Sequence, residues 1–243
     1  MDRERRIKVG CCGWAEAQAE YLRVFKVIEV QETFYQPGRI EKYEKWRKAA
    51  PQGFEFAVKA WQLITHEPSS PTYRRLKAPV LRSKRDRYGS FRTTDEVFAA
   101  WEVTALVGEA LRAGIVLFQS PASFAPTAEN RRNLGAFFSK IDRRSFTLAW
   151  EPRGAWEGKD IMPLCRDLDL VHCVDPFQSK PVHGRVRYFR LHGRPGYDLR
   201  YRYREEDLQD LLDMIDRKTA YVLFNNLTML DDAKRFQRLI EGA

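Results

Sequence analysis

The sequence contains no long run of apolar residues. No run approaches the ~18 residues that cross a lipid bilayer. The charged residues 1–6 lead into an apolar segment too short for the hydrophobic region of a signal peptide. We therefore expect a cytoplasmic protein without a membrane partner.

Cysteine and histidine are also scarce, with four residues of each among 243. Cys11, Cys12, Cys165 and Cys173 form neither a C-x-x-C pair nor an evenly spaced framework. This spacing argues against a disulfide scaffold and against a structural zinc site, so we expect reduced thiols and assign no metal ligands.

Short apolar segments of strand length recur eight times. They cover residues 7–11, 24–30, 54–60, 114–119, 146–151, 170–175, 187–192 and 220–225. Helix-like segments separate most of them, at residues 40–49, 94–112, 128–141, 161–168, 205–215 and 231–240. This alternation predicts an α/β fold, a single (β/α)8 TIM-type barrel with one domain over residues 1–243. An open doubly wound sheet fits the same alternation, but the glycine-rich phosphate loop that would favour it is missing.

The net charge of +9 is concentrated in two stretches. Residues 74–92 contain eight basic residues and one acid, and residues 185–204 contain seven and one. Such local basicity indicates loops that meet an anion. The first stretch falls in the one long connection, so we predict a long basic loop after strand 3, either functional or disordered.

Charged residues interrupt the apolar segments near their C-terminal ends, where the loops of a barrel form the active site. The candidate catalytic residues are Glu29, Lys59, Glu151, Asp175 and His192. Arg190 and His192 alternate with apolar neighbours and therefore face the same side. Because an ionised side chain is costly in a dry interior, this set either forms a salt-bridged network or lines a wet cavity.

His192 is the strongest candidate among the histidines because it shares a strand end with Arg190 and Arg194 and precedes a glycine. Neutral, it could act as a general base; protonated, it could hold an anion. Glu29, Glu151, Asp175 and His192 have the donor atoms of a divalent metal site, but no H-E-x-x-H-like spacing supports one. The sequence identifies no cofactor.

Aromatic residues gather at the same strand ends. They are Trp14, Phe34, Tyr35, Trp61, Trp156 and Tyr188. Most aromatic residues belong to the core, and beside basic loops they could also stack on bases or sugars.

A series of motifs runs along nearly the whole chain. It comprises Val-Gly-Cys-Cys-Gly-Trp (9–14), Ile-Glu-Val-Gln-Glu-Thr-Phe-Tyr (28–35), Phe-Ala-Val-Lys-Ala-Trp (56–61), Ile-Thr-His (64–66), Val-Leu-Phe-Gln-Ser-Pro (116–121), Glu-Pro-Arg (151–153), Tyr-Phe-Arg-Leu-His-Gly-Arg (188–194) and Phe-Asn-Asn (224–226). In this order the series resembles the DUF72 (YecE-like) family. The resemblance implies a TIM barrel and no particular reaction.

The resemblance also implies a polar pocket in which further side chains join the candidate catalytic residues. The substrate-binding candidates are Thr33, Tyr35, His66, Gln119, Arg153, Arg190, Arg194 and Asn226, with Trp156 added from the aromatic residues. Two departures from the family pattern are Gln31-Glu32, where Asn and a small residue are common, and Gly154, where His is usual. The second weakens any mechanism that needs a pair of histidines.

Three functions remain open. The first is an enzyme, a hydrolase or another phosphate-ester-directed enzyme, whose substrate carries phosphate or another anion and could be a nucleic acid. Lys59, Arg153 and Arg190 would hold the anion while a carboxylate or His192 transfers a proton. The second is a non-catalytic nucleic-acid-binding protein with residues 74–92 and 185–204 as its surface, and the third is a metal-dependent isomerase or hydrolase. The expected partner is an anionic small molecule or nucleic acid.

Overall fold

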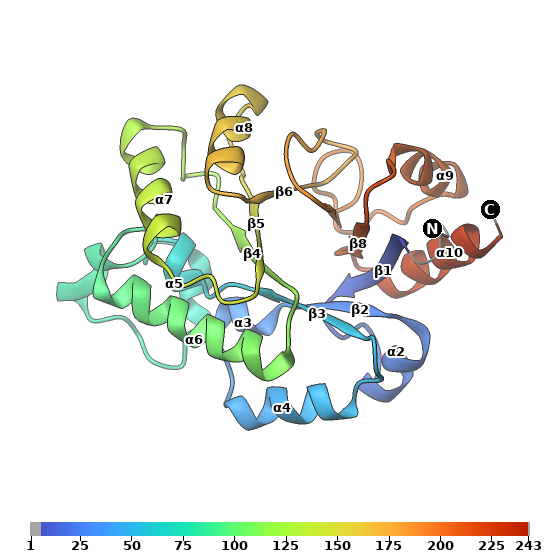
Figure 1. Cartoon of the computed structure of the whole chain (residues 1–243), viewed down its shortest axis with the longest axis horizontal. Helices are drawn as coiled ribbons and strands as arrows, with labels where there is room; N and C mark the ends of the chain where they lie inside the picture. Colours follow the sequence, from blue (N-terminus) through green and yellow to red (C-terminus); the bar gives the residue numbers. More distant parts are fainter. Residues whose placement is uncertain (1–5, 243) are drawn as a thin grey trace.

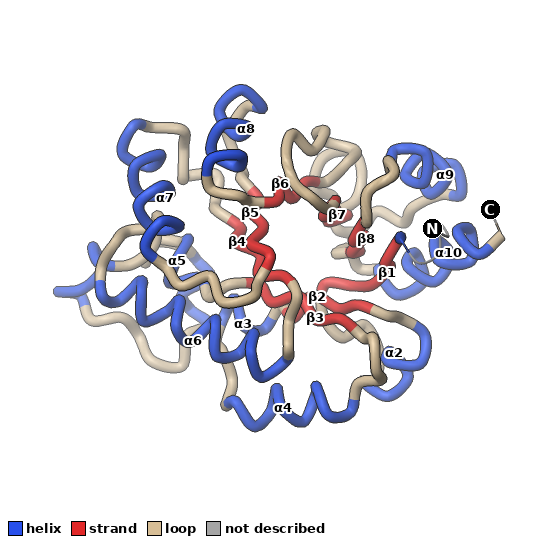
Figure 2. Tube along the Cα trace, in the orientation of Figure 1, coloured by secondary structure: helices blue, strands red, loops and turns tan. Residues whose placement is uncertain are grey.

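The computed structural model describes residues 6–242 and shows a closed barrel of eight parallel strands. Each strand is hydrogen-bonded to the next in chain order, and the last returns to the first. The strands are β1 (Ile7–Cys12), β2 (Val27–Val30), β3 (Glu55–Lys59), β4 (Ile115–Gln119), β5 (Thr147–Glu151), β6 (Val171–Val174), β7 (Arg187–Leu191) and β8 (Ala220–Phe224). Figure 2 shows them as a ring enclosed by helices, which confirms the predicted TIM-type barrel.

The barrel interior is filled by side chains that alternate along each strand with side chains facing the helices. On β3, Ala57 belongs to the interior cluster, whereas its neighbours Phe56 and Val58 pack in the outer layer. Because side chains repeat their direction every two residues, Lys59 projects into the interior at the C-terminal end of the same strand.

The outer layer consists of α2 (Gln18–Val24), α3 (Glu32–Tyr35), α4 (Ile40–Ala49), α5 (Gln62–Thr65), α6 (Asp95–Leu111), α7 (Ala128–Lys140), α8 (Gly158–Asp167), α9 (Glu205–Met214) and α10 (Met229–Glu241). The predicted helix at residues 40–49 is confirmed as α4. Figure 1 shows α10 beside β1, so the last described helix packs on the first strand. No helix within residues 6–242 has the length and apolar character to cross a membrane.

One predicted strand begins too early. Residues 24–30 form one apolar segment, but α2 ends at Val24 and β2 begins only at Val27. Phe25 closes the helix, donating its backbone N–H to the Tyr21 carbonyl at 2.9 Å, and its side chain is buried. The apolar residues at the end of α2 therefore run directly into those of β2. Sequence periodicity cannot show where the helix ends and the strand begins.

The connection between β6 and β7 contains no helix in residues 175–186, all of which are described. Two hydrogen bonds hold the loop to β6 instead. Val182 donates its backbone N–H to His172 Nδ1 at 3.2 Å, and the backbone N–H of His172 donates to the His183 carbonyl at 3.1 Å. This side of the barrel mouth is therefore bordered by a loop.

The long connection from α5 to α6 contains two 3₁₀ helices, Pro71–Arg75 and Arg82–Arg87. Ion pairs hold its second half, joining Arg87 to Glu96 at 2.6 Å and Arg92 to Glu67 at 2.7 Å. Part of the basic stretch is thus used to fasten the loop to its flanks.

Candidate functional site

The polar side chains of the site form one layer at the C-terminal end of the barrel. Deeper in the barrel, the inward-facing residues are apolar or small, such as Val27, Ala57 and Ala149. Two residues further along the strands, the same alternation turns polar residues inward. These are Glu29, Lys59, Gln119, Glu151, Asp175 and Arg190.

Arg190 lies at the centre of this layer and is only 1% exposed. Its Nη1 donates to Glu151 Oε2 at 2.5 Å, and its Nη2 lies 3.0 Å from Glu29 Oε1. Tyr188 donates its hydroxyl to Glu29 Oε2 at 2.8 Å. Two acids from β2 and β5 therefore hold one guanidinium from β7 in a salt-bridged network.

This network fixes the ionisation of its members. Burial alone would raise the pKa of Glu151, but the guanidiniums of Arg190 and Arg153 lower it well below its ordinary range. Burial alone would lower the pKa of Arg190, but the carboxylates of Glu151 and Glu29 raise it well above the usual value. A carboxylate held this firmly is a poor proton acceptor, so Glu151 is suited to positioning arginines.

Arg153 connects Glu151 to His192. Its Nη2 lies 2.6 Å from Glu151 Oε1 and also donates to His192 Nε2 at 3.0 Å. The ring of Tyr197 covers the guanidinium at 3.9 Å. Unlike Arg190, the Arg153 side chain is 19% exposed, so it can reach a ligand.

His192 is oriented from both sides. Arginine can only donate, so Nε2 of His192 accepts from Arg153 and the neutral imidazole carries its proton on Nδ1. Nδ1 lies 3.6 Å from Asp175 Oδ2, which accepts the His192 backbone N–H at 2.9 Å. Burial lowers the pKa of His192 despite Asp175, so the imidazole is neutral at neutral pH. His192 is thus a base whose Nε2 lone pair accepts from Arg153 at 3.0 Å and is also approached by Arg190 Nη1 at 3.4 Å.

Lys59 is held by an uncharged partner. Its Nζ donates to Gln119 Oε1 at 2.7 Å and lies 4.0 Å from the centre of the Phe34 ring. Burial lowers the pKa of Lys59 to about 7, and Arg190 adds to this. His66 packs edge-on against Phe34 at 4.9 Å, where burial and Lys59 lower the pKa of His66 to about 3.

Two predicted binding residues at the end of β2 contact protein groups. Thr33 donates its hydroxyl to the Lys59 carbonyl at 2.6 Å, joining the ends of β2 and β3. The Tyr35 ring lies 3.4 Å from the guanidinium carbon of Arg75, on the long basic loop.

Three more predicted binding residues are engaged away from the Arg190 network. Arg194 pairs with Asp207 on α9 at 2.6 Å. Asn226 donates its amide to Tyr201, Thr228 and Asp232, at 2.8, 2.9 and 2.6 Å. The indole N–H of Trp156 donates to the Phe124 carbonyl, although its ring still lines the cavity described next.

A cavity of about 250 Å³ opens between the ends of β5 and β6 and the loop after β6. Its polar lining includes Glu151, Arg153, Asp175, Ser179, Lys180 and Tyr197. His192 does not line it, and Arg153 touches both the cavity and His192. Ligand pockets for drug-sized molecules are about 300–1,000 Å³, so this cavity suits a smaller polar group.

The second basic stretch, residues 185–204, spans the length of the barrel. Arg187 opens β7 at the opposite end from the site and pairs with Asp216. Beyond the site, Arg202 pairs with Asp231 at 2.8 Å. In the first stretch, the described cations without an ion pair are Arg74, Arg75, Lys77, Arg82 and Arg85. Most of the second stretch is therefore neutralised within the fold, whereas the first stretch keeps five cations without an ion pair.

The donors considered for a metal do not form a ligand set. Within the described part of the chain, no group of three or more His, Cys, Asp or Glu side chains is placed to hold a metal ion. Glu29 and Glu151 face Arg190, and Asp175 faces the backbone of His192.

The sequence as a whole matches one known family. The family described as "Protein of unknown function DUF72" covers residues 8–243. The chain belongs to the DUF72 family. This agrees with the resemblance that the motifs carry.

Relatives of this DUF72 chain are similar along their full length. The UPF0759 protein YunF of Bacillus subtilis (strain 168) is 23% identical over 287 positions, covering 97% of this chain and 94% of YunF. The crystal structure of a DUF72 family protein (EF0366) from Enterococcus faecalis V583 has a TM-score of 0.72 at 19% identity and covers 97% of both chains. A DUF72 family protein (TM1631) from Thermotoga maritima MSB8 gives 0.69 at 18% identity, covering 97% of this chain and 99% of its own. At these identities the structures share the fold.

Two residues of the DUF72 site were not among the predicted site residues. Tyr197 follows β7 in a loop, and its ring lies 4.8 Å from His192 and covers Arg153. Gln31 donates its side-chain amide to Glu29. Neither residue lies in a strand, so no periodicity could have placed it.

Proposed function

We propose that this DUF72 protein is an enzyme that transfers a proton on a small substrate bearing phosphate or another anionic group. The observation that carries the proposal is the position of Arg153, which lines the cavity and also donates to His192 Nε2 at 3.0 Å. An anion in the cavity competes for this guanidinium, since bidentate contacts to phosphate or carboxylate are its strongest hydrogen bonds. Substrate binding then removes Arg153 from His192 Nε2 and leaves Arg190 Nη1, at 3.4 Å, as the remaining arginine contact of that atom.

Each neighbour of His192 has a role in this scheme. Asp175 holds the backbone and faces Nδ1, so it keeps the proton on Nδ1 and leaves Nε2 as the basic atom. Glu151 positions Arg153 through Oε1. Lys180 and Ser179, which line the cavity from the loop after β6, supply further donors to the anion.

The size of the cavity favours a small substrate over a nucleic-acid duplex. About 250 Å³ accepts one anionic group with a short carbon skeleton. Binding to a nucleic-acid backbone would instead need a continuous run of cations, and several arginines of the two stretches are paired with acids.

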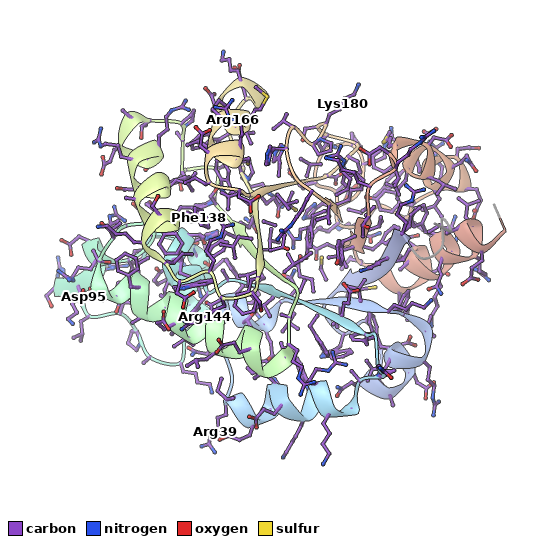
Figure 3. The ribbon with its side chains drawn as sticks, in the orientation of Figure 1. Arg39, Asp95, Phe138, Arg144, Arg166 and Lys180 are labelled. Atoms are coloured by element: carbon purple, nitrogen blue, oxygen red, sulfur yellow. The ribbon has the colours of Figure 1, made fainter. Side chains whose placement is uncertain are left out.

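Calorimetric titration with inorganic phosphate tests the anion site. We expect Arg153→Gln to weaken binding at least tenfold, whereas Arg166→Gln, an exposed arginine on α8 paired with its neighbour Asp167, leaves it unchanged (Figure 3). Equal affinities for the two variants, or no binding at millimolar phosphate, would overturn the proposal.

The release of His192 is tested separately by NMR titration of the histidine rings. Phosphate should raise the pKa of His192, because an anion arrives and a guanidinium leaves. An unchanged titration of His192 in the phosphate complex would refute the gating by Arg153.

A further inference from the structure

Lys59 differs from the other lysines of the chain. It is the one lysine among residues 6–242 that is buried, with 5% of its surface exposed. Its hydrogen-bond acceptor is the neutral amide of Gln119, and it forms no ion pair with a described carboxylate. The nearest acids, Glu29 and Glu151, are held by arginines.

This environment favours the neutral amine. A buried ammonium without a counter-ion is costly, and the Phe34 ring at 4.0 Å compensates it only in part. With burial lowering the pKa of Lys59 to about 7, about half of the molecules carry a neutral amine at pH 7. For a lysine at the ordinary value of 10.5 the fraction is roughly one in 3,000.

We propose that Lys59 is a nucleophile that forms an imine with a carbonyl group of the substrate, so that the substrate class is a small aldehyde or ketone carrying an anionic group. This rests on the proposed function. The Nζ lone pair forms a bond to the carbonyl carbon, and the carbonyl oxygen leaves as water with the two hydrogens of the amine. No oxidant or reductant is needed, and hydrolysis reverses the step.

The imine would explain why the site contains a general base, His192. When protonated, it withdraws electrons from the adjacent carbon and makes the C–H bonds there acidic. Lys59 donates to Gln119, which pairs with Glu151 across β4 and β5, and His192 Nε2 lies 4.0 Å from Glu151 Oε1. The two groups therefore flank Glu151 at the barrel mouth, and the substrate of this proposal extends past Glu151 to reach both. His192, freed from Arg153, takes the proton from that carbon.

Reductive trapping tests the proposal. The protein is incubated at pH 7 with glycolaldehyde phosphate and cyanoborohydride, which reduces an imine to a stable amine, and the labelled lysine is located by peptide mass spectrometry. We expect one adduct on Lys59, absent from Lys59→Met and retained in Lys140→Met, whose lysine is exposed at the end of α7. Labelling spread over exposed lysines without Lys59 would overturn the proposal.

A second variant keeps the lysine and changes only its partner. Gln119→Glu places a carboxylate beside Nζ, which favours the ammonium form. We expect the half-maximal labelling of Lys59 to move from near pH 7 to a clearly higher pH, with less adduct at pH 7. An unchanged pH profile would show that the neutral amine does not control the labelling.

The uncharged probe glycolaldehyde separates this proposal from the proposed function. If both probes label Lys59 equally, the imine stands and the selection for an anion fails. If phosphate binds in calorimetry and Lys59 is never labelled, the imine alone fails.

Discussion

Replacing Arg190 with methionine removes a cation that contacts two buried carboxylates. Methionine keeps most of the length of the side chain and no charge. In the variant, Glu29 and Glu151 stay in an interior where they are 0% and 2% exposed, without the guanidinium between them. Glu151 keeps Arg153, and Glu29 keeps the Tyr188 hydroxyl.

The expected loss of stability is large. Removing one partner from a buried ion pair costs about 3–5 kcal/mol, because the remaining charge is left uncompensated. For a chain of this size, about 2–4 °C of melting temperature is lost per kcal/mol, so the midpoint should fall by roughly 6–20 °C.

The loss should also depend on pH. In the parent protein the folded-state pKa of Glu151 lies below its ordinary value of 4.5, so its stabilising effect is complete above that pH and is lost as the pH falls further. Without Arg190, the pKa of Glu151 in the folded state rises, because burial raises it and the strongest opposing charge is gone. The ionised carboxylate then destabilises the variant at pH 7.5, and protonation relieves this penalty towards pH 5.

Urea unfolding at pH 7.5 and 5.0, followed by tryptophan fluorescence, measures both effects. The gap between parent and variant should narrow at the lower pH. The control is Arg144→Met, because Arg144 makes exposed ion pairs with Glu102 and Glu109 on α6 (Figure 3), and it should change little. A variant as stable as the parent at pH 7.5, or one equally destabilised at both values, would refute the reasoning.

Two further predictions concern the backbone. Gly193→Ala should disrupt the loop after β7 and lower the melting temperature, because Gly193 has a φ of +93° and a Cβ would lie 1.8 Å from the Asp198 carbonyl oxygen. Gly196→Ala should lower the melting temperature less, because Gly196 has a φ of +66° and open space around its Cβ position. Equal melting temperatures for the two variants would contradict this reasoning. Thr94→Ala should cost about 0.5–2 kcal/mol in urea unfolding, because the Thr94 hydroxyl caps α6 by accepting the Val97 N–H, and Thr94→Ser should recover most of the loss.

The strands and the inward-facing charges were predictable because both follow local periodicity. Arg190 and His192 were expected on one side of β7, and the structure places both beside Glu151. The pairing within the layer could not be predicted, because partners such as Glu29 and Arg190 are brought together by closure of the barrel and not by spacing along the chain.

Loops limited the prediction of the site more than strands did. Arg194 and Asn226 stand in motifs of the family, yet Arg194 contacts Asp207, and Asn226 contacts the loop after β7 and the start of α10. Tyr197 covers His192 from a segment without periodicity. Such contacts depend on the path of the loop, which local sequence does not determine.

The charged layer contains two kinds of group with different consequences for a ligand. Arg190 is sealed between two carboxylates and supports the barrel mouth without reaching solvent. Lys59 and Arg153 have partners that a ligand can replace. Lys59 faces the neutral amide of Gln119, and Arg153 shares its Nη2 with the imidazole of His192. A ligand can therefore compete for one amine and one guanidinium, and moving Arg153 leaves His192 Nε2 with the longer contact to Arg190 Nη1. The proposed substrate has one group for each of these side chains. Its anionic group binds Arg153, its carbonyl reacts with Lys59, and its acidic proton passes to His192.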